Sequence, residues 1–221
     1  MNGPGTLAVV ATPLGDARDL SPRAAETLRA ADLIVAEDTR SARRLLGEIG
    51  AETKTILSCF DANEAARAAE VAERLAGGAN IALISEAGTP LVSDPGYRIV
   101  AAAISAGARI VPIPGPSAVL AALVGAGLPT DRFLFLGFPP RKSGARRRLF
   151  ESVRLLPYTL VLYESPLRTG ATLADLAAVL GDGRRACVAR ELTKPHEELV
   201  RAPLAHLAAK YETDRPLGEA A

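Results

Sequence analysis

The sequence predicts an α/β protein of two domains, each built around a mostly parallel sheet. Short runs of aliphatic residues alternate with amphipathic helical stretches along nearly the whole chain, as in strand–helix–strand units. One proline-rich segment, residues 112–116, interrupts the alternation near its middle. With 221 residues, of which 48% are hydrophobic, the chain can form two cores of roughly 100 residues each. We therefore expect domains at residues 1–112 and 117–221, with a ligand cleft between them.

The first domain is predicted to alternate strands with helices throughout. Ser21 and Pro22 supply an N-cap and a proline at the first helical position, and Gly50 and Gly77 end the second and third helices. Strands are expected near residues 6–11, 33–36, 55–58, 81–84 and 109–111, and helices near 22–31, 41–49, 63–76 and 97–106.

The alternation restarts after residues 112–116, which read Pro-Ile-Pro-Gly-Pro. Prolines fix φ and keep the residues before them extended, so this segment marks the domain boundary. Helices are then expected from about residue 117, at 143–156 and at 173–180, and strands at 133–136, 159–163 and 186–189.

Composition excludes several classes of protein. Cys59 and Cys187 are far apart and the chain has only two histidines, so we expect neither a disulfide framework nor a metal site. No apolar run approaches the ~18 residues of a membrane span, and the amino terminus does not read as a signal peptide. A cytoplasmic protein is therefore expected, in keeping with unpaired cysteines. Phosphate-binding loops of the GxxxxGK[ST] and GxGxxG types and a nucleophile elbow are absent from the sequence.

Loops after the predicted strands are dense in glycine, proline and carboxylates. The carboxyl ends of parallel strands share one edge of a sheet, so these loops are expected to converge there. Turn and capping requirements explain any single loop, but the set favours a ligand site. For Glu37 and Asp38, the alternative is an ion pair with Arg40 that only caps the following helix. The loops are residues 12–16, 37–40, 85–90, 93–96, 115–117, 163–166 and 190–194.

Together these segments resemble the small-subunit ribosomal RNA (cytidine-2′-O)-methyltransferase family of the tetrapyrrole methylase superfamily. The resemblance extends over nearly the whole chain in the order of the family motifs. The segments that carry it are 10–15 (VATPLG), 36–40 (AEDTR), 85–97 (SEAGTPLVSDPGY), 114–117 (PGPS), 127–129 (GLP), 163–166 (YESP) and 189–194 (ARELTK).

The resemblance implies a two-domain fold that binds S-adenosylmethionine between its domains, usually as a homodimer. It implies methylation of a cytidine ribose hydroxyl, with small-subunit ribosomal RNA or the assembled small subunit as partner. Matching the family motifs residue by residue gives these cofactor-binding candidates: Pro13, Glu86, Ala87, Gly88, Ser117, Ala118, Tyr163 and Ala189.

The sequence departs from the family pattern at several places. Glu86 stands where the family commonly has Asp, Leu167 where it has His, and residues 59–64 (CFDANE) where it has a histidine-bearing stretch. The family also continues after a Gly-Glu pair like Gly218-Glu219 into a further strand and a tail domain. We therefore expect the tail domain to be absent. Either the second sheet lacks an edge strand, or the sequence is a trimmed form of a longer chain.

A ribose hydroxyl needs a base, and Glu37 or Asp38 is the predicted proton acceptor, with Arg40 holding the pair or a substrate phosphate. A basic segment is the predicted RNA contact, because cations at a helix start oppose the helix dipole. The alternative is a solvated helix start. The RNA-binding candidates are Arg141, Lys142, Arg146, Arg147 and Arg148.

Two other functions remain open at this point. A porphyrinogen C-methyltransferase of the same superfamily would need no arginine run. A noncatalytic RNA-binding ribosome-assembly protein would bind RNA without S-adenosylmethionine.

Overall fold

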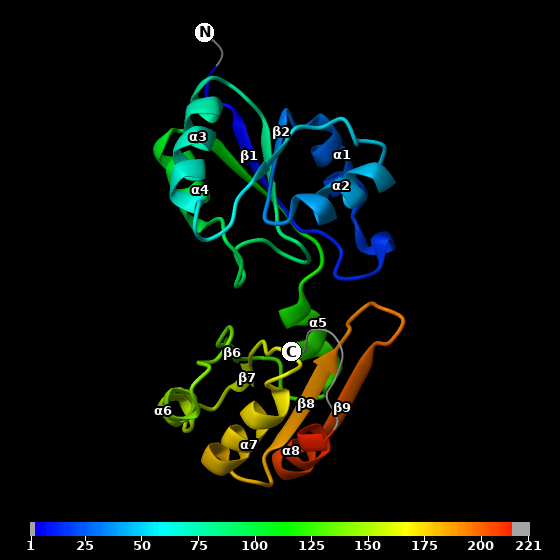
Figure 1. The fold of residues 1–221 in the computed structure, drawn as a ribbon, viewed down its shortest axis with the longest axis vertical. Coiled ribbons are helices and arrows are strands. Elements are labelled where there is room, and N and C mark those ends of the chain that lie inside the picture. Colours follow the sequence, from blue (N-terminus) through cyan, green and yellow to red (C-terminus); the bar gives the residue numbers. More distant parts are fainter. Residues whose placement is uncertain (1–2, 214–221) are drawn as a thin grey trace. The chain divides into compact units, whose positions relative to one another are not determined.

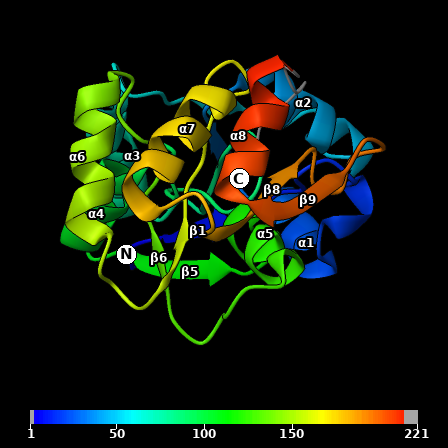
Figure 2. The ribbon, with the colours of Figure 1, turned by 90° about the horizontal axis from the view of Figure 1, so that it is seen from below.

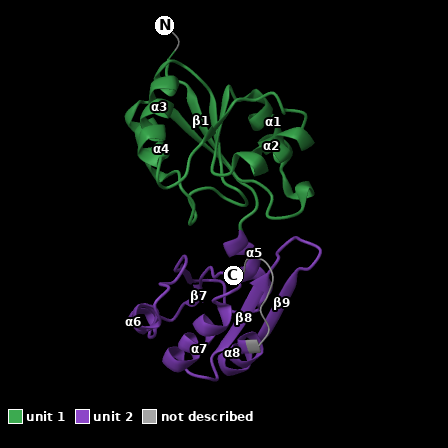
Figure 3. Ribbon diagram, viewed as in Figure 1, with its two compact units in different colours: residues 1–117 green, residues 118–221 purple. Residues whose placement is uncertain are grey.

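The computed structural model describes residues 3–213, which form two compact units (Figures 1 and 3). Unit 1 is Met1–Ser117 and unit 2 is Ala118–Ala221. The predicted α/β class is confirmed. Each unit has its own hydrophobic core and is described by itself.

Unit 1 contains a fully parallel five-stranded sheet. The strand order is β3-β2-β4-β1-β5, so β1 and β4 are neighbours although three α-helices, one short 3₁₀ helix and two strands separate them in the chain. The strands are β1 (Thr6–Val10), β2 (Leu33–Ala36), β3 (Ile56–Ser58), β4 (Ile81–Ile84) and β5 (Arg109–Ile113).

Helices cover both faces of this sheet (Figure 1). Successive strand side chains point to opposite faces, so Ile34 packs in the core beneath α1 and α2 while Val35 packs beneath α3 and α4. The helix after β1 and the helix after β4 therefore lie on opposite faces, and in such sheets ligands bind where neighbouring strands diverge in this way. The helices are the short 3₁₀ helix η1 (Ala17–Asp19), α1 (Pro22–Ala30), α2 (Thr39–Glu48), α3 (Glu64–Ala76) and α4 (Tyr97–Ser105).

Unit 2 contains two small sheets and four helices in its described part. β6 pairs with β7 in parallel, and β8 pairs with β9 in antiparallel fashion. Helices α6, α7 and α8 pack side by side (Figure 2). The elements are α5 (Ala118–Ala126), β6 (Phe133–Phe135), α6 (Ser143–Val153), β7 (Thr159–Val161), α7 (Thr169–Leu180), β8 (Arg185–Arg190), β9 (Glu198–Pro203) and α8 (Leu204–Thr213).

The sequence reading of unit 2 missed its last two elements. β9 runs directly into α8 without a glycine or a loop to separate them, and its sequence ELVRAP has no alternation of apolar and polar residues. The helix expected at 173–180 begins four residues earlier, at Thr169. The local sequence carries no pattern that would predict β9, because it is the pairing with its hairpin partner β8 that makes this segment a strand.

A largely apolar cavity of about 430 Å³ lies inside unit 2. Residues of β7, β8, α5 and α7 line it, so it lies between the β6–β7 pair and the β8–β9 pair. In the described backbone no ladder joins β7 to β8. The predicted absence of a strand from this sheet stays a prediction.

Replacing Gly170 with alanine should destabilise unit 2. A Cβ at Gly170 would lie 2.3 Å from the carbonyl oxygen of Tyr211, so α7 and α8 would have to separate. Overpacking of this kind costs about 1–3 kcal/mol in the free energy of unfolding, measured by urea titration. The control is Gly144→Ala in α6, where the new Cβ would meet only the tip of Arg148 at 3.8 Å. Equal stability of the two variants would contradict the prediction.

Candidate active site

Two loops of unit 1 are joined by an isolated antiparallel bridge between Thr12 and Gly88. The Thr12 amide donates to the Gly88 carbonyl at 2.8 Å, and the Gly88 amide donates back at 3.0 Å. Gly88 has a φ of +79°, a conformation that side chains rarely adopt, and a Cβ there would lie 3.0 Å from the Leu14 side chain. The bridge therefore places Pro13 beside the loop that carries Glu86 and Ala87.

A third loop joins this pair through the side chain of Thr89. Its hydroxyl donates to the Pro116 carbonyl at 2.9 Å. Gly115 allows the segment to approach β1, since a Cβ there would lie 3.0 Å from that of Ala11. The structure thus gathers five predicted cofactor residues at the carboxyl ends of β1, β4 and β5. They are Pro13, Glu86, Ala87, Gly88 and Ser117.

The other three cofactor candidates belong to unit 2. Ala118 opens α5, and Ala189 is buried in β8. Tyr163 follows β7 and packs against two phenylalanines, with ring centroids 4.9 Å from Phe135 and 5.4 Å from Phe138. Their assignment to a cofactor remains a prediction.

Glu37 lies directly after β2, in a partly buried position. Burial raises the pKa of its carboxyl group above the ordinary value, and the negative charges of Asp94, Glu86, Asp61 and Asp38 raise it further. A carboxylate with a raised pKa is a stronger base than an ordinary one. Glu37 therefore has the electrostatic environment of a proton acceptor.

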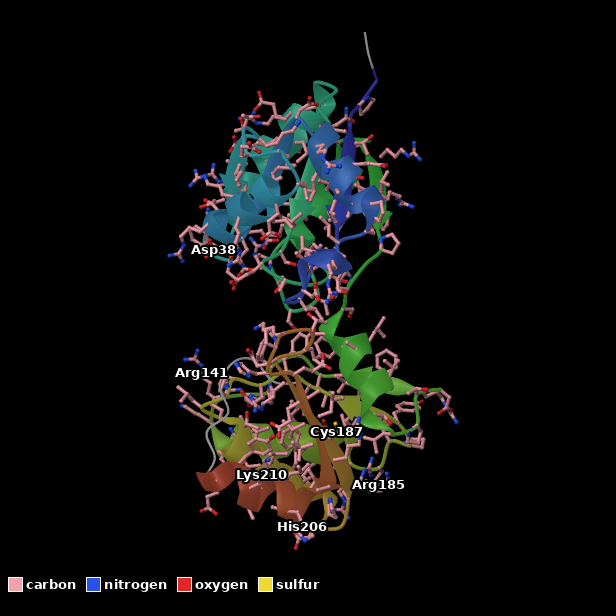
Figure 4. The ribbon with its side chains drawn as sticks, turned by 90° about the vertical axis from the view of Figure 1, so that its right-hand side faces the viewer. Asp38, Arg141, Arg185, Cys187, His206 and Lys210 are labelled. Carbon is pink, nitrogen blue, oxygen red and sulfur yellow. The ribbon has the colours of Figure 1, made fainter. Side chains whose placement is uncertain are left out.

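Asp38 has a different environment although it is the next residue. Its carboxylate caps α2, accepting from the amide of Arg40 at 2.7 Å and from that of Ser41 at 3.3 Å. Arg40 also donates a side-chain hydrogen bond of 3.1 Å, and these bonds from Arg40 lower the pKa of Asp38. Asp38 thus takes the capping role, while the exposed guanidinium of Arg40 reaches into solvent (Asp38 is labelled in Figure 4).

Glu64 is a site residue that the sequence reading did not select. Its buried carboxylate accepts from the backbone amides of Gly96 and Arg98, at 2.8 and 2.9 Å, and so caps α4 from the start of α3. This contact holds the loop that carries Asp94 beside the loop that carries Asp61. The negative charges of both aspartates act on Glu37 and raise its pKa. The signal was present, since Glu64 ends the stretch 59–64 that departs from the family pattern.

The basic segment at the start of α6 separates into exposed and buried cations. Arg141, Lys142 and Arg148 are exposed, and Figure 4 shows Arg141 projecting away from unit 2. Arg147 is also exposed, but it bonds to Asp175 through its Nε at 2.6 Å. Arg146 is buried, and its guanidinium lies within 2.8 Å of the Asp175 carboxylate.

The prediction that Arg146 contacts RNA is therefore wrong. Its charge is already paired inside the protein, because Asp175 on α7 accepts bonds from Ser143, Arg146 and Arg147. Burial would raise the pKa of Asp175, but these hydrogen bonds outweigh burial and lower it. The periodicity of α6 places residue 146 on its buried face, and the number of basic residues in the segment does not show which of them lie on that face.

The described residues, 3–213, contain neither a metal-binding cluster nor a membrane-spanning helix. No group of three or more histidine, cysteine, aspartate or glutamate side chains is placed to hold a metal ion. None of the described helices has the length and hydrophobicity needed to cross a membrane.

Comparison with known families bears on this geometry. A family model described as Tetrapyrrole (Corrin/Porphyrin) Methylases matches residues 6–208. The chain belongs to this family. The tetrapyrrole methylase membership implied by the loop motifs is thereby confirmed, and the protein is a methyltransferase by family.

Within the family, the chain is similar to proteins named Ribosomal RNA small subunit methyltransferase I. The one from Pseudomonas aeruginosa is 49% identical over 203 residues, 92% of this chain and 72% of the relative. The one from Escherichia coli O157:H7 is 45% identical over 220 residues, 99% of this chain and 77% of the relative.

Solved structures of tetrapyrrole methylase relatives share the fold. Diphthine synthase matches with a TM-score of 0.74 at 20% identity, covering 98% of this chain and 88% of that one. Uroporphyrin-III C-methyl transferase from Thermus thermophilus, solved in complex with S-adenyl homocysteine, matches with a TM-score of 0.67 at 19% identity, covering 98% and 96%. The tetrapyrrole methylase architecture therefore extends over the described chain.

Asp175→Asn should lower the free energy of unfolding of unit 2 by about 3–5 kcal/mol, because it leaves Arg146 buried without its counter-charge. Since the pKa of Asp175 is lowered in the folded state, its stabilisation is present above the unfolded carboxyl pKa of about 3.9 and is lost as pH falls through the folded value. Urea titrations at several pH values measure both effects.

The exposed residue Asp182 provides the control for this variant. Asp182→Asn should change the free energy of unfolding by less than about 0.5 kcal/mol at every pH. A gap between wild type and Asp175→Asn that stayed constant in acid would contradict the charge-pair account.

Proposed function

We propose that this methyltransferase uses S-adenosylmethionine to methylate the ribose 2′-oxygen of a cytidine in small-subunit ribosomal RNA, acting as a homodimer on the RNA or the assembled subunit. The observation that carries the choice of ribosomal RNA as substrate is the 45–49% identity, over more than nine-tenths of the chain, to proteins named for methylation of small-subunit ribosomal RNA. The cytidine 2′-oxygen as acceptor rests on the resemblance of the loop motifs to the family. The exposed cations at the start of α6 support a polyanionic substrate.

The residues of unit 1 fit the cofactor chemically. Glu86 offers an exposed carboxylate that can accept hydrogen bonds from a ribose diol. The small residues Ala87 and Gly88 follow it in the loop that is held by Thr12, so no large side chain fills the space beside it. Pro13 and Ser117 flank the same edge. When bound, S-adenosylmethionine supplies a methyl group on a positively charged sulfur.

The chain's own residues then have to orient the acceptor and remove its proton. Positioning supplies most of the acceleration in a displacement of this type. Glu37 accepts the proton of the 2′-hydroxyl, for which its raised pKa suits it. Arg40, anchored by Asp38, is free to hold a neighbouring phosphate.

Glu37→Gln should reduce methyl transfer by about 10²–10⁴-fold, because it removes the base. The measurement is transfer of labelled methyl groups from S-adenosylmethionine to unmodified small subunits, with the product mapped by the resistance of a 2′-O-methylated linkage to alkali. In wild type, kcat should fall as pH drops through the raised pKa of Glu37, and the residual activity of Glu37→Gln should lack this acid limb.

Asp38→Asn is the matched control, because asparagine caps a helix about as well as aspartate. It should keep activity within a few-fold of wild type and retain the acid limb. Full activity of Glu37→Gln would refute the assignment of the base, and label absent from the RNA in wild type would refute the function.

Arg141→Glu combined with Arg148→Glu should weaken RNA binding at least tenfold and reduce its salt dependence, because two phosphate contacts become repulsive. The control is Arg109→Glu, at the exposed amino end of β5, opposite the strand ends that carry the candidate site. Filter binding at several salt concentrations measures both. Unchanged affinity in the double variant would exclude this segment as the RNA contact.

A further inference from the structure

The loop of residues 137–142, which joins β6 to α6, exposes an aromatic ring beside its cations. Phe138 is 53% exposed, whereas its neighbour Pro139 is buried. Exposed Arg141 and Lys142 follow within four residues. Burying a phenylalanine side chain stabilises a protein by about 1.5–3 kcal/mol, so the fold gains little from the exposed ring.

Backbone contacts hold this loop in place along its length. The Gly137 carbonyl accepts from the Tyr163 amide at 2.9 Å. The Pro139 carbonyl accepts from Arg168 at 2.9 Å, and the Arg141 carbonyl accepts from Arg146 at 3.3 Å. The exposure of Phe138 is therefore a fixed property of the loop.

Buried carboxylates hold the two arginines that bind the loop. Glu164 accepts from Arg168 Nε at 2.7 Å and from the Thr172 hydroxyl at 2.6 Å, and Asp175 holds Arg146 in the same manner. Both arginine charges are thus neutralised internally. The charge that the loop offers to a ligand comes from Arg141 and Lys142.

The Phe138 ring is braced on one side and open on another. Tyr163 lies 5.4 Å away between ring centroids, tilted by 54°, so it supports the edge of the ring without covering it in a parallel stack. Tyr163 is itself held edge-on by Phe135. The loop thus carries a supported flat apolar surface, followed three and four residues later by two exposed cations, and this combination suits a nucleobase and its flanking phosphates.

We propose that Phe138 stacks on one unpaired base of the RNA while Arg141 and Lys142 contact the phosphates beside it. The inference rests on the proposed function, because it needs RNA as the substrate. Aromatic residues are only 4% of the chain, so the surface accommodates one base and not a stacked series. Phe138 sets which nucleotide is held next to Tyr163.

The chain contains no tryptophan, so Phe138→Trp introduces a unique fluorescent reporter at the proposed contact. Titration with a short unpaired oligocytidylate should quench its emission by at least half, with an affinity within about twofold of wild type. The same oligonucleotide with abasic positions should bind through its phosphates and quench weakly. The matched control is Phe133→Trp, at an aromatic position of β6 that is 40% exposed, and it should bind RNA without quenching.

Phe138→Ala tests the energetics separately. Loss of one stacked base should weaken oligocytidylate binding by about 5- to 140-fold and leave the salt slope unchanged, because stacking involves no counterion release. Phe138→Leu, which keeps the hydrophobicity but not the flat ring, should resemble Phe138→Ala.

The outcomes distinguish the two proposals. RNA binding with an unquenched Phe138→Trp, or with unchanged affinity in Phe138→Ala, would overturn the stacking role and leave the proposed function intact. No RNA binding by wild type would count against the proposed function itself. A change in sedimentation coefficient in Phe138→Ala at unchanged RNA affinity would reassign the ring to a protein contact.

Discussion

The bridge between Thr12 and Gly88 is the contact on which the site of unit 1 depends. The helices that follow the neighbouring strands β1 and β4 lie on opposite faces of the sheet, so the loops after these strands would diverge without a contact between them. Two backbone hydrogen bonds join them, and they form only because Gly88 adopts a positive φ. The Thr89 hydroxyl then joins a third loop to these two by donating a hydrogen bond to the Pro116 carbonyl. Three loops thus share one backbone framework without any charged side chain being needed to hold them.

Because backbone bonds and Thr89 hold these loops, the carboxylates at the carboxyl edge of the sheet are not needed to hold them. The negative charges of Asp94, Glu86 and Asp61 all act on Glu37. Bringing like charges together is unfavourable, so contacts outside this group have to hold the loops. Glu64 does this from the start of α3, through two backbone amides of the Asp94 loop. The raised pKa of Glu37 therefore follows first from its burial and then from the negative charges that these loops bring near it. Glu37 and Asp38 differ in environment because the charges of these loops act on Glu37, whereas the Asp38 carboxylate caps α2.

The sequence predicted most of unit 1 because its signals are local. The Ser21-Pro22 pair marks the start of α1, and the Ser21 hydroxyl caps it at 3.1 Å as the pattern indicates. β9 and α8 were missed because a strand that passes directly into a helix has no turn residues to mark the boundary. β9 exists as a strand because it pairs with β8, and this pairing is a tertiary contact that the local sequence does not show.

The environments of the charged site residues also depend on tertiary contacts, which the sequence does not show. The family motifs located the loops that carry Pro13, Glu86 and Ser117, but a motif does not say which of two adjacent carboxylates is a base. In the basic segment, Arg146 and Arg148 look alike in the sequence, yet α6 turns one toward Asp175 and the other toward solvent. Only packing decides that difference.

The buried arginines show why a loop with exposed cations can also depend on cations that solvent does not reach. A flexible loop of exposed lysines and arginines would lose much conformational entropy on ordering against phosphate. In unit 2 that cost is met during folding, because Arg146 and Arg168 bind backbone carbonyls of the loop and are neutralised by Asp175 and Glu164. Buried ion pairs contribute little net stability by themselves, but they fix geometry. Their role here is to present a small exposed surface in one conformation.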